Sequence, residues 1–371
     1  MQKQLKKMWP VVFTSLVALT GVVEAANGSN DAQMRNLENR VSALERSKSG
    51  TGGMVNPSGR PAVKDGWGVF ITADALLWQP RENGLEYATK VDGAQFTGAH
   101  SKEKSPRFSW DWGFRVGLGY NMEHDQWDLY LNWTWLRGKS HHHNTANAGS
   151  GEVILPRWSD PGSLGGATAS SASAHWKLRL NVLDLELGRE FYVSKWVTVR
   201  PHMGLRTAWI KQTYDVDYSG LNINGVAREI DMRNKYWGLG VRGGVNTDWG
   251  LGGGVSIYGN AAISILYGFF SVSKQESLEL TSGAAFNNIT NLSDFYHVSR
   301  AITDLQLGLR YDYMFCDDRY HFGIQAGWEH HMFFGQNQFI LNVDDVAHGV
   351  TVANQGDLTM QGWTLNVRFD F

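Results

Sequence analysis

A stretch of period-two alternation between Trp110 and Leu136 constrains the fold of this chain more than any other feature of its sequence. Its first half, WDWGFRVGLGY, carries apolar or aromatic side chains at every second position and small or charged ones between them. A short polar turn at 121–125 precedes the same pattern in WDLYLNWTWL. Two such strands joined by a tight turn predict an antiparallel β-hairpin with one apolar and one polar face.

Alternation alone would also suit a half-buried sheet of a soluble protein, but three features favour a membrane. Each strand keeps its pattern for about ten residues, the length that a tilted strand needs to cross the hydrocarbon core. Tryptophans gather at the strand ends, where the aromatic girdles of membrane barrels lie. The second face combines charges with glycines, which suits a polar lumen. We interpret the hairpin as two lipid-facing strands of an outer-membrane β-barrel.

The composition agrees with long strands. A net charge of −2 shows no bias toward nucleic acid, and 42% hydrophobic residues would suit a soluble protein. Barrel strands hide their apolar residues by alternation, so this average does not exclude a membrane protein. Glycine is abundant (42) and proline scarce (8), as uninterrupted strands require. The single cysteine, Cys316, excludes an intrachain disulfide or a cysteine metal cluster, and no cofactor is expected.

The chain begins with a predicted secretion signal at 1–25. Lysines open it, an apolar core follows at 11–23, and a small-residue cleavage site ends at Ala25. No later run of about eighteen apolar residues could form a spanning helix. A secreted chain of this kind can cross a bilayer only as a closed barrel, so we expect an outer-membrane location in a Gram-negative cell.

Residues 26–48 are expected to form a short periplasmic helix. Met34, Leu37, Val41 and Leu44 have the spacing of a coiled-coil seam, which would join subunits of a homo-oligomer. Two heptads are marginal alone, and a solvated helix lying on a neighbour explains the pattern equally well. Residues 49–66, rich in Gly, Ser and Pro, predict a flexible linker to a barrel domain at 67–371.

The barrel domain shows alternating segments separated by connections that are short and long in turn. The predicted strands number ten: roughly 67–78, 108–120, 126–137, 175–188, 196–210, 234–248, 254–270, 299–313, 319–331 and 358–371. Two more result if 86–95 or 221–231 pair as strands. Short periplasmic turns and long outer loops are typical of outer-membrane up-and-down barrels, and an even number leaves both termini periplasmic. The last strand ends at Phe371, as in barrels delivered to an outer-membrane insertion machine.

Two of these segments also resemble a known family. WGVFITADALLWQPRENGLEYA (67–88) and FSWDWGFRVGLGYNMEHDQWDLYLNWTW (108–135) are similar to the Legionella major-outer-membrane-protein-like family, which includes pore-forming porins of chlamydia-related bacteria. The resemblance implies a Gram-negative outer-membrane pore. The outer loops show no recognisable resemblance, so no substrate preference carries over.

The faces predicted to point inward are unusually charged for a β-sheet. The candidate pore-lining residues are Asp111, Arg115, Asp128, Lys177, Arg179, Asp184, Glu186, Arg200, Arg206, Arg242, Asp304, Arg310, Asp312, Glu329 and Arg368. To place Lys177 and Arg179 inward, the prediction needs a β-bulge near Asn181, where the apolar parity changes. A mid-bilayer Arg or Lys facing lipid would cost about 2–4 kcal/mol, so these charges must face the lumen.

Charges of this kind support two functions. They could form a constriction that sorts ions and small solutes by passive diffusion, or pair with one another and fill a narrow barrel. Eight strands close around side chains alone whereas sixteen leave a channel, so ten favour a narrow pore. Inward glycines would leave lumen volume or merely relieve crowding. The alternative function is a non-conducting adhesin or structural surface protein that uses loops 138–174 and 271–298.

Other polar clusters are weaker candidates. His141, His142 and His143 in a predicted outer loop are consecutive and cannot all reach one metal ion from a regular element, so no metal site is expected. Asp317 and Asp318 are interpreted as turn formers. A surface protease would need acidic residues and a histidine at the outer rim; Asp344, Asp345 and His348 lack an opposing partner, so we expect no enzyme. Cys316 is interpreted as an unreactive thiol, with an intersubunit disulfide as the alternative.

Overall fold

The computed structural model describes residues 57–92, 100–122, 126–222, 227–279, 287–344 and 350–371. The expected signal at 1–25, the helix at 26–48 with its seam, and residues 49–56 of the linker at 49–66 lie outside this part of the chain. Residues 57–66 run along the end of the barrel that carries the short turns. There Ser58 forms a β-bridge with Phe191, and Lys64 forms an ion pair with Asp318.

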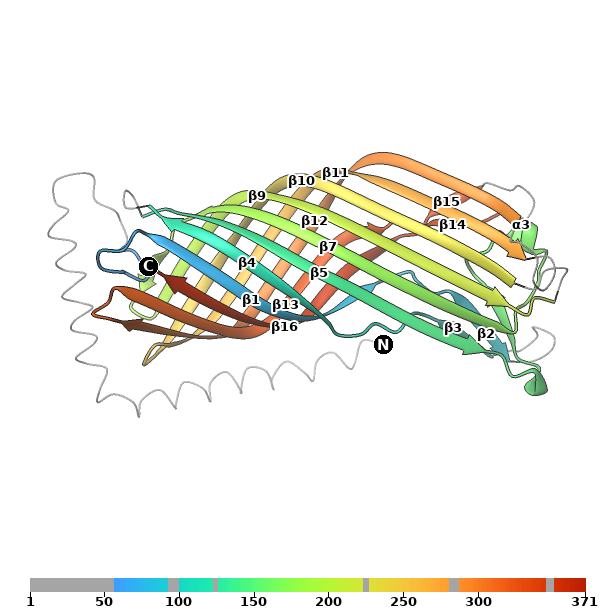
Figure 1. Ribbon diagram of the computed structural model, residues 1–371, viewed down its shortest axis with the longest axis horizontal. Helices are drawn as coiled ribbons and strands as arrows, with labels where there is room; N and C mark the ends of the chain where they lie inside the picture. Colours follow the sequence, from blue (N-terminus) through green and yellow to red (C-terminus); the bar gives the residue numbers. More distant parts are fainter. Residues whose placement is uncertain (1–56, 93–99, 123–125, 223–226, 280–286, 345–349) are drawn as a thin grey trace, which may run out of the picture.

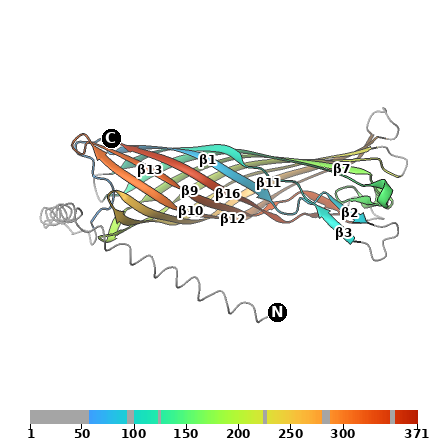
Figure 2. The same ribbon diagram turned by 90° about the horizontal axis from the view of Figure 1, so that it is seen from below.

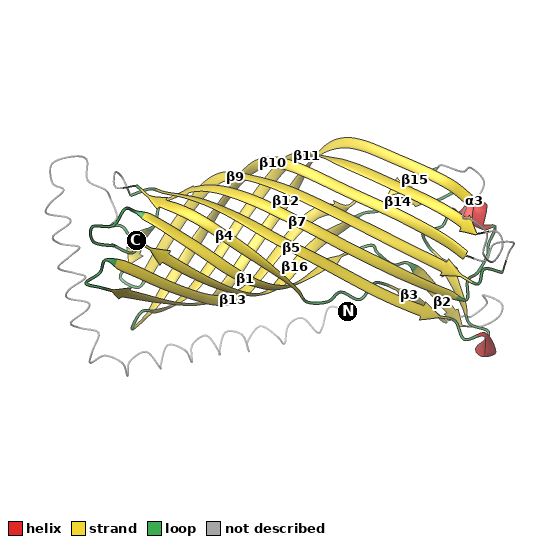
Figure 3. Cartoon of the chain, in the orientation of Figure 1, coloured by secondary structure: helices red, strands yellow, loops and turns green. Residues whose placement is uncertain are grey.

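Ten long antiparallel strands close into one barrel, as the alternation predicts. They are β1 (Val69–Glu82), β4 (Asp111–Asn121), β5 (Asp128–Thr145), β7 (Ser171–Gly188), β9 (Val197–Ser219), β10 (Ala227–Gly252), β11 (Val255–Glu279), β12 (Asn287–Phe315), β13 (Tyr320–Asn337) and β16 (Gly356–Asp370). The first strand closes the wall because β1 pairs with both β4 and β16. Figures 1 and 3 show the tilted wall of strands, and Figure 2 shows the elongated barrel from below.

The connections at the two ends differ as expected. At the end near the C-terminus they are tight, and three successive turn residues, Cys316, Asp317 and Asp318, adopt positive φ. Asp317 and Asp318 are therefore turn formers.

Smaller elements lie in the other connections: β2 (Ala88–Asp92), β3 (His100–Lys104), η2 (Ala148–Ser150), β6 (Val153–Pro156), α3 (Pro161–Leu164), β14 (Ile340–Asn342) and β15 (Thr351–Ala353). Strand β8 (Phe191–Ser194) extends a short turn and pairs with β9.

Two aromatic girdles on the outer surface mark the membrane. Trp237 and Trp249, both exposed on β10, lie twelve residues apart, or about 40 Å along an extended strand. A strand tilt of about 45° reduces this to about 30 Å, the thickness of the hydrocarbon core. Other exposed aromatic residues at the outer level include Trp112, Trp209, Trp328 and Trp363; Tyr120, Trp127, Trp196 and Tyr320 lie at the periplasmic level.

The strands continue well beyond the outer girdle. Strand β9 runs ten residues past Trp209 to Ser219, and β11 runs ten residues past Phe269 to Glu279. In this extension the two faces of the wall exchange character. The inward positions become apolar, as at Leu178 and Val216, whereas the outward positions become charged. Most of the predicted strands end near the girdle because the lipid-facing apolar pattern stops there, whereas the strand predicted at 175–188 continues beyond it.

The register corrects two expectations from the sequence. Strand β7 pairs with β5 and β9 without interruption, so there is no β-bulge near Asn181. In addition, His141, His142 and His143 lie on strand β5 rather than in a loop. Their side chains therefore alternate: His142 faces Tyr87 on the inner side, and His141 contacts His175 on the outer side.

Candidate functional site: the charged lumen and the outer plug

The membrane-level lumen contains a network of ion pairs that crosses the barrel. Arg115 on β4 binds Asp74 on β1 and Glu329 on β13, each at 2.8 Å. His331, two residues beyond Glu329 on the same face, contacts the Glu329 carboxylate at 2.8 Å and the Asp304 carboxylate on β12 at 2.7 Å. These residues link one wall of the barrel to the opposite wall.

Asp304 joins this first group to a second one. It accepts hydrogen bonds from Arg206 at 2.7 Å and from Arg242. Arg206 also binds Asp184 at 2.6 Å, and Arg242 binds Glu186 at 3.0 Å. Arg206 and Arg242 therefore each lie between a carboxylate on β7 and Asp304 on β12, two strands that are not adjacent in the wall. Arg206 pairs with Asp184 through two parallel hydrogen bonds.

A third group lies toward the periplasmic mouth. Arg200 binds Asp128 with a 3.0 Å contact from Nε, and Arg310 pairs with Asp248 and Asp312. His321 bridges Asp312 at 2.8 Å and Asp370 at 2.7 Å. Arg368 pairs with Asp370, and its guanidinium lies 3.9 Å from the centre of the Phe70 ring.

A cavity of about 220 Å³ remains between these groups. Arg115, Arg206, Arg242 and Glu329 line it, and the apolar side chains of Trp78 and Phe333 border it as well. Trp78 marks the change from a charged to an apolar interior, because its ring contacts both Arg115 and His331 while its Nε1 donates to Thr364 at 3.1 Å.

Most candidate residues from the sequence do face this lumen. Those that the structure brings into the network are Arg115, Asp128, Asp184, Glu186, Arg200, Arg206, Arg242, Asp304, Arg310, Asp312, Glu329 and Arg368. Asp111 stands apart at the outer rim, where its carboxylate accepts the backbone N–H of Lys139 at 3.2 Å.

The inward placement of Lys177 and Arg179 is wrong. Both side chains are exposed on the outer surface, and Trp176 and Leu178 on the same strand are buried inside. The parity change at Asn181 comes from the exchange of faces above the membrane and not from a bulge. Burying Trp176 and Leu178 inside the barrel offers more apolar contact than burying two cations would.

Several members of the network are not among the candidate residues predicted from the sequence. The inward orientation of Asp74 follows from the alternation in the sequence, because ITADALL places Thr72 and Asp74 on the face opposite Ile71 and Ala73. The inward orientation of His331 follows in the same way, since it shares a strand face with Glu329. Asp370 and His321 lie at strand ends, where single-sequence boundaries are least reliable.

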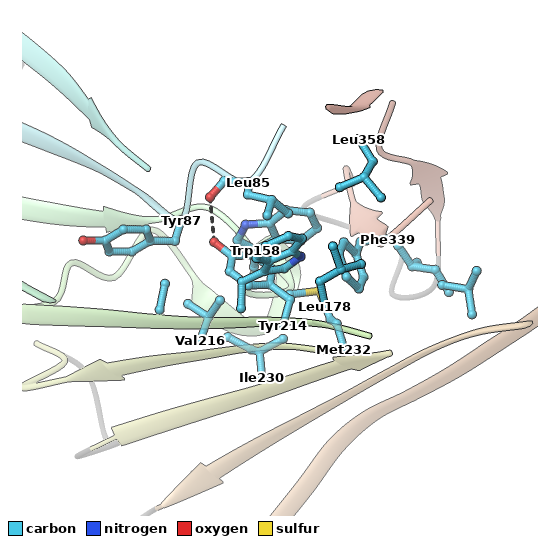
Figure 4. Packing of buried hydrophobic residues seen from close by; sticks show 14 of the residues in the cluster. Leu85, Tyr87, Trp158, Leu178, Tyr214, Val216, Ile230, Met232, Phe339 and Leu358 are labelled. Carbon is cyan, nitrogen blue, oxygen red and sulfur yellow. Dashed lines mark hydrogen bonds between the residues drawn. The ribbon is translucent and has the colours of Figure 1, made fainter. Parts of the chain in front are cut away.

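Beyond the membrane level, an outer plug fills the barrel. We use this name for residues 157–164, which follow β6 and include α3. The plug inserts Trp158, which is fully buried against Tyr214 and Phe339, with ring centres 5.6 and 6.3 Å away. Figure 4 shows these side chains converging from several strands. Trp158 Nε1 donates to the Glu86 carbonyl at 2.9 Å, which satisfies the one polar atom of the ring.

A buried polar cluster fixes the plug to the wall. Arg228 on β10 pairs with Glu276 on β11 at 2.7 Å and donates to Ser163 Oγ at 2.9 Å. Glu276 accepts the backbone N–H of Asp160 at 2.9 Å, and Lys274 Nζ donates to the Trp158 carbonyl at 2.6 Å. Removing Arg228 or Glu276 would leave an uncompensated buried charge, so the cluster holds the plug firmly in place.

Lys274 lies outside the membrane, five residues past the girdle residue Phe269 on β11. Burial lowers the pKa of its ammonium group from 10.5 to about 8, although Glu276 and Asp160 act in the opposite direction. The ammonium group donates to the Trp158 carbonyl and to Asn342 Oδ1, each at 2.6 Å.

The weaker candidates gain little from the structure. Asp345 and His348 lie outside the described residues. Among the described residues, no group of three or more His, Cys, Asp or Glu side chains is arranged to hold a metal ion. Within the same part of the chain, no helix is long and apolar enough to cross a membrane. Cys316 is exposed in its turn.

A closed antiparallel barrel with an apolar outer band between two aromatic girdles and a charged interior defines an outer-membrane β-barrel protein. Residues 60–371 match the family described as Legionella pneumophila major outer membrane protein precursor, and the chain belongs to that family. The protein is accordingly located in the outer membrane of a Gram-negative cell. No curated protein matches the chain.

Solved structures resemble the barrel only loosely. The outer membrane protease OmpT of Escherichia coli has a TM-score of 0.42 at 10% identity, covering 82% of this chain and 96% of its own. The translocator domain of the autotransporter NalP of Neisseria meningitidis has a TM-score of 0.29 at 10% identity, with coverages of 92% and 98%. The toluene transporter TodX of P. putida has a TM-score of 0.22 at 8% identity, with coverages of 85% and 93%. Likenesses at this level carry no activity over to this chain.

Proposed function

We propose that the protein is a narrow, charge-lined pore for small ions, closed at its outer end in this conformation by the outer plug. The proposal rests on the change from a charged to an apolar interior along the barrel axis. A charged cavity of about 220 Å³ lies at membrane level, and the apolar packing around Trp158 lies beyond it. The plug belongs to a connection between strands and not to the wall, so it can leave without opening the barrel.

The width of the lumen favours small ions over larger solutes. Arg115 reaches Glu329 and Arg206 reaches Asp304 across the interior, so paired charges line the lumen along its axis. A permeating ion would exchange places with one member of a pair, as in charged constrictions of known channels. A larger solute would have to displace several pairs at once.

A non-conducting adhesin or structural barrel is the second candidate. It is favoured by the packing of the outer plug against the Arg228–Glu276 pair of the wall, which is almost completely buried, with side chains 1% and 0% exposed. If this cluster never opens, the charged lumen only stabilises the barrel. The two candidates differ in whether ions cross the membrane.

Planar-bilayer recording separates the two candidates. The wild-type protein is compared with Trp158→Ala, which removes the anchor of the plug, and with Trp158→Phe, which keeps a ring there. We expect rare, brief openings from the wild type and from Trp158→Phe, and an open probability at least about tenfold higher from Trp158→Ala, equivalent to about 1.4 kcal/mol. Silence from all three proteins in a correctly folded state would reject the pore and leave the structural barrel.

Ion selectivity tests the role of the lumen in the same recordings. In the Trp158→Ala background, Arg115→Ala removes a cation of the network and should shift the reversal potential in a salt gradient toward cation preference. Arg310→Ala tests the periplasmic mouth in the same way. Lys102→Ala in the exposed strand β3 is the matched control and should leave the reversal potential unchanged. Unchanged selectivity in both lumen variants would remove these residues from the permeation path.

A further inference from the structure

Four basic side chains form a continuous row on the outer surface of adjacent strands. Arg137 on β5 is paired in register with Arg179 on β7, Arg179 with Lys211 on β9, and Lys211 with Lys235 on β10. All four are exposed. Adjacent strands lie about 4.8 Å apart, so this basic row is about 14 Å long. Figure 1 shows β5, β7, β9 and β10 side by side in the wall.

The basic row has a defined height relative to the membrane. The register positions immediately below it are occupied by Trp135, Asn181, Trp209 and Trp237, which are also paired directly across the same four strands. Three of these are residues of the outer aromatic girdle. Two residues along a strand correspond to about 7 Å, so the cations lie just above the girdle, at the level of lipid headgroups.

The cations are concentrated in this sector of the wall. The next register position outward adds Lys139, Lys177 and Arg233 on the same strands. On the neighbouring strand β11, however, Ser271 faces Lys235, and Phe295 on β12 faces Ser271. The basic surface therefore ends at β11 and does not form a ring around the barrel.

Within the described part of the chain, none of the four cations in the basic row forms an ion pair with a carboxylate. The Arg137 guanidinium lies over the Trp135 ring, 5.1 Å from its centre. The nearest such pair on this surface is Lys177–Asp215 at 3.6 Å, one position further outward. Like charges placed directly opposite one another destabilise a sheet. A row of four without counter-charges points to an anion supplied by the surroundings.

The carboxylates above the row limit where that anion can lie. On both β9 and β10 the outward side chains follow one order away from the membrane: tryptophan, lysine, one further position, then two carboxylates. Asp215 is paired with Asp231, and Asp217 with Glu229. An anion would be repelled by these carboxylates and attracted by the basic row, so it is confined to the level just above Trp209 and Trp237.

We propose that the basic row binds the phosphate groups of a diphosphorylated glycolipid in the outer leaflet. Two phosphates would occupy the space along its length of about 14 Å, each between cations of neighbouring strands, as Arg and Lys bind phosphate. The acyl chains would lie against the exposed apolar side chains below, including Leu185, Leu205 and Leu239. Charge complementarity and continuity with the lipid-facing surface identify a lipid headgroup as the ligand.

Native mass spectrometry of the purified full-length protein tests the proposal. The probes are lipid A in diphosphoryl and dephosphorylated forms, together with inorganic phosphate. The test variant carries R137Q, R179Q, K211Q and K235Q. A matched control removes the same number of charges from exposed positions elsewhere: R81Q, K102Q, K195Q and R319Q. Heat-modifiable migration on gels verifies that each barrel is folded, and the smaller variant K211Q/K235Q is used if the fourfold variant fails to fold.

We expect the diphosphoryl form to bind the wild type and the control at least about tenfold more tightly than the test variant, a difference of about 1.4 kcal/mol. The dephosphorylated form should bind all three proteins alike. Equal binding of the diphosphoryl form to the wild type and the test variant would overturn the proposal. Displacement of that lipid by inorganic phosphate at equal concentration would also overturn it, because the site would then be a simple anion site.

Thermal unfolding of the same proteins provides a second readout. The difference in unfolding temperature between the wild type and the test variant should change sign when lipid is added. In neutral detergent the test variant should unfold at the same temperature as the wild type or higher, because repulsion along the row is removed. After addition of diphosphoryl lipid A, the wild type should become the more stable of the two, since ligand binding stabilises only the protein that binds. If lipid stabilises both proteins equally, the basic row is not the site.

Discussion

Arg206 on β9 and Asp304 on β12 form an ion pair at 2.7 Å, although β10 and β11 lie between these strands in the wall. Such a contact is made through the lumen and not along the sheet. It shows that the interior at membrane level is narrow enough for side chains of non-adjacent strands to touch. The barrel is therefore held together by its interior charges as well as by the hydrogen bonds of its wall.

Asp304 should be among the most sensitive positions in the lumen. It accepts from Arg206, Arg242 and His331, so Asp304→Ala would leave two guanidinium groups short of a counter-charge. Breaking a buried pair from one side destabilises by about 3–5 kcal/mol, and lumen water should bring this toward the lower end. Urea unfolding in lipid vesicles measures the loss of stability.

The control for Asp304 is Asp111→Ala at the outer rim, where the carboxylate accepts a hydrogen bond from the backbone of Lys139 and no buried ion pair is broken. That change should cost about 1 kcal/mol. In the double variant Asp304→Ala with Arg206→Gln, the two losses should be less than additive by about 0.5–3 kcal/mol. Strict additivity would mean that the pair across the lumen contributes nothing to stability.

Inward glycines have a structural role that a substitution can reveal. A Cβ on Gly119 would lie 2.0 Å from the Phe70 ring, which covers this glycine and stacks on Tyr130. Overpacking of this kind costs about 1–3 kcal/mol, so Gly119→Ala should lower the unfolding midpoint. Gly243→Ala is the control, because its Cβ would meet no atom closer than 3.9 Å. Equal effects of the two changes would contradict this explanation.

The outer plug should respond to the loss of Trp158 before the barrel does. Truncating a buried tryptophan to alanine costs about 3–5 kcal/mol in lost contacts. This loss makes it easier for the plug to unfold locally and detach from the barrel while the wall stays folded. We expect Trp158→Ala to be cleaved by trypsin after Arg157 at least about a hundredfold faster than the wild type, while the barrel stays folded. Trp158→Phe should resist cleavage nearly as well as the wild type. Unchanged cleavage of Trp158→Ala would show that other contacts hold the plug.

The alternation predicted the membrane-level wall because lipid outside and charge inside impose opposite chemistry on successive residues. Arg115, Asp184 and Arg368 could be placed in the lumen on this basis alone. The same rule failed for Lys177 and Arg179. Above the girdle the barrel has water outside and an apolar plug inside, so the chemistry of the two faces is exchanged. A change of parity in a sequence can therefore mark the membrane surface instead of a bulge.

The outer plug itself could not have been predicted from periodicity. Trp158 comes from the segment RWSDPGSL, which has no regular spacing, and its partners Tyr214 and Phe339 lie far away in the chain. The local signal in this segment is Asp160 followed by Pro161, the N-cap and first residue of α3, and this signal says nothing about where the helix packs. Contacts of this kind depend on the path of a connection through space, and no local pattern encodes that path.

Burial of Lys274 beneath the outer plug should make the free energy of unfolding increase with pH. In the unfolded chain its pKa is about 10.5, and burial lowers the pKa to about 8 in the folded protein. Below both values the lysine is protonated in either state, and the folded state bears the full cost of the buried ammonium. Between them the unfolded chain binds more protons, so the free energy of unfolding should rise with pH by about 3 kcal/mol in total.

Comparison with Lys274→Met isolates this contribution. The free energy of unfolding of both proteins is measured with denaturant from about pH 7 to about pH 11. Subtracting the variant's value from the wild-type value at each pH removes the contribution of the other titrating groups. That difference should increase across the window and level off above the pKa of the unfolded lysine. The conservative variant Lys274→Arg, which stays protonated throughout, should show no such rise. A wild-type curve parallel to that of Lys274→Met would mean that Lys274 keeps an ordinary pKa and is hydrated in the folded protein.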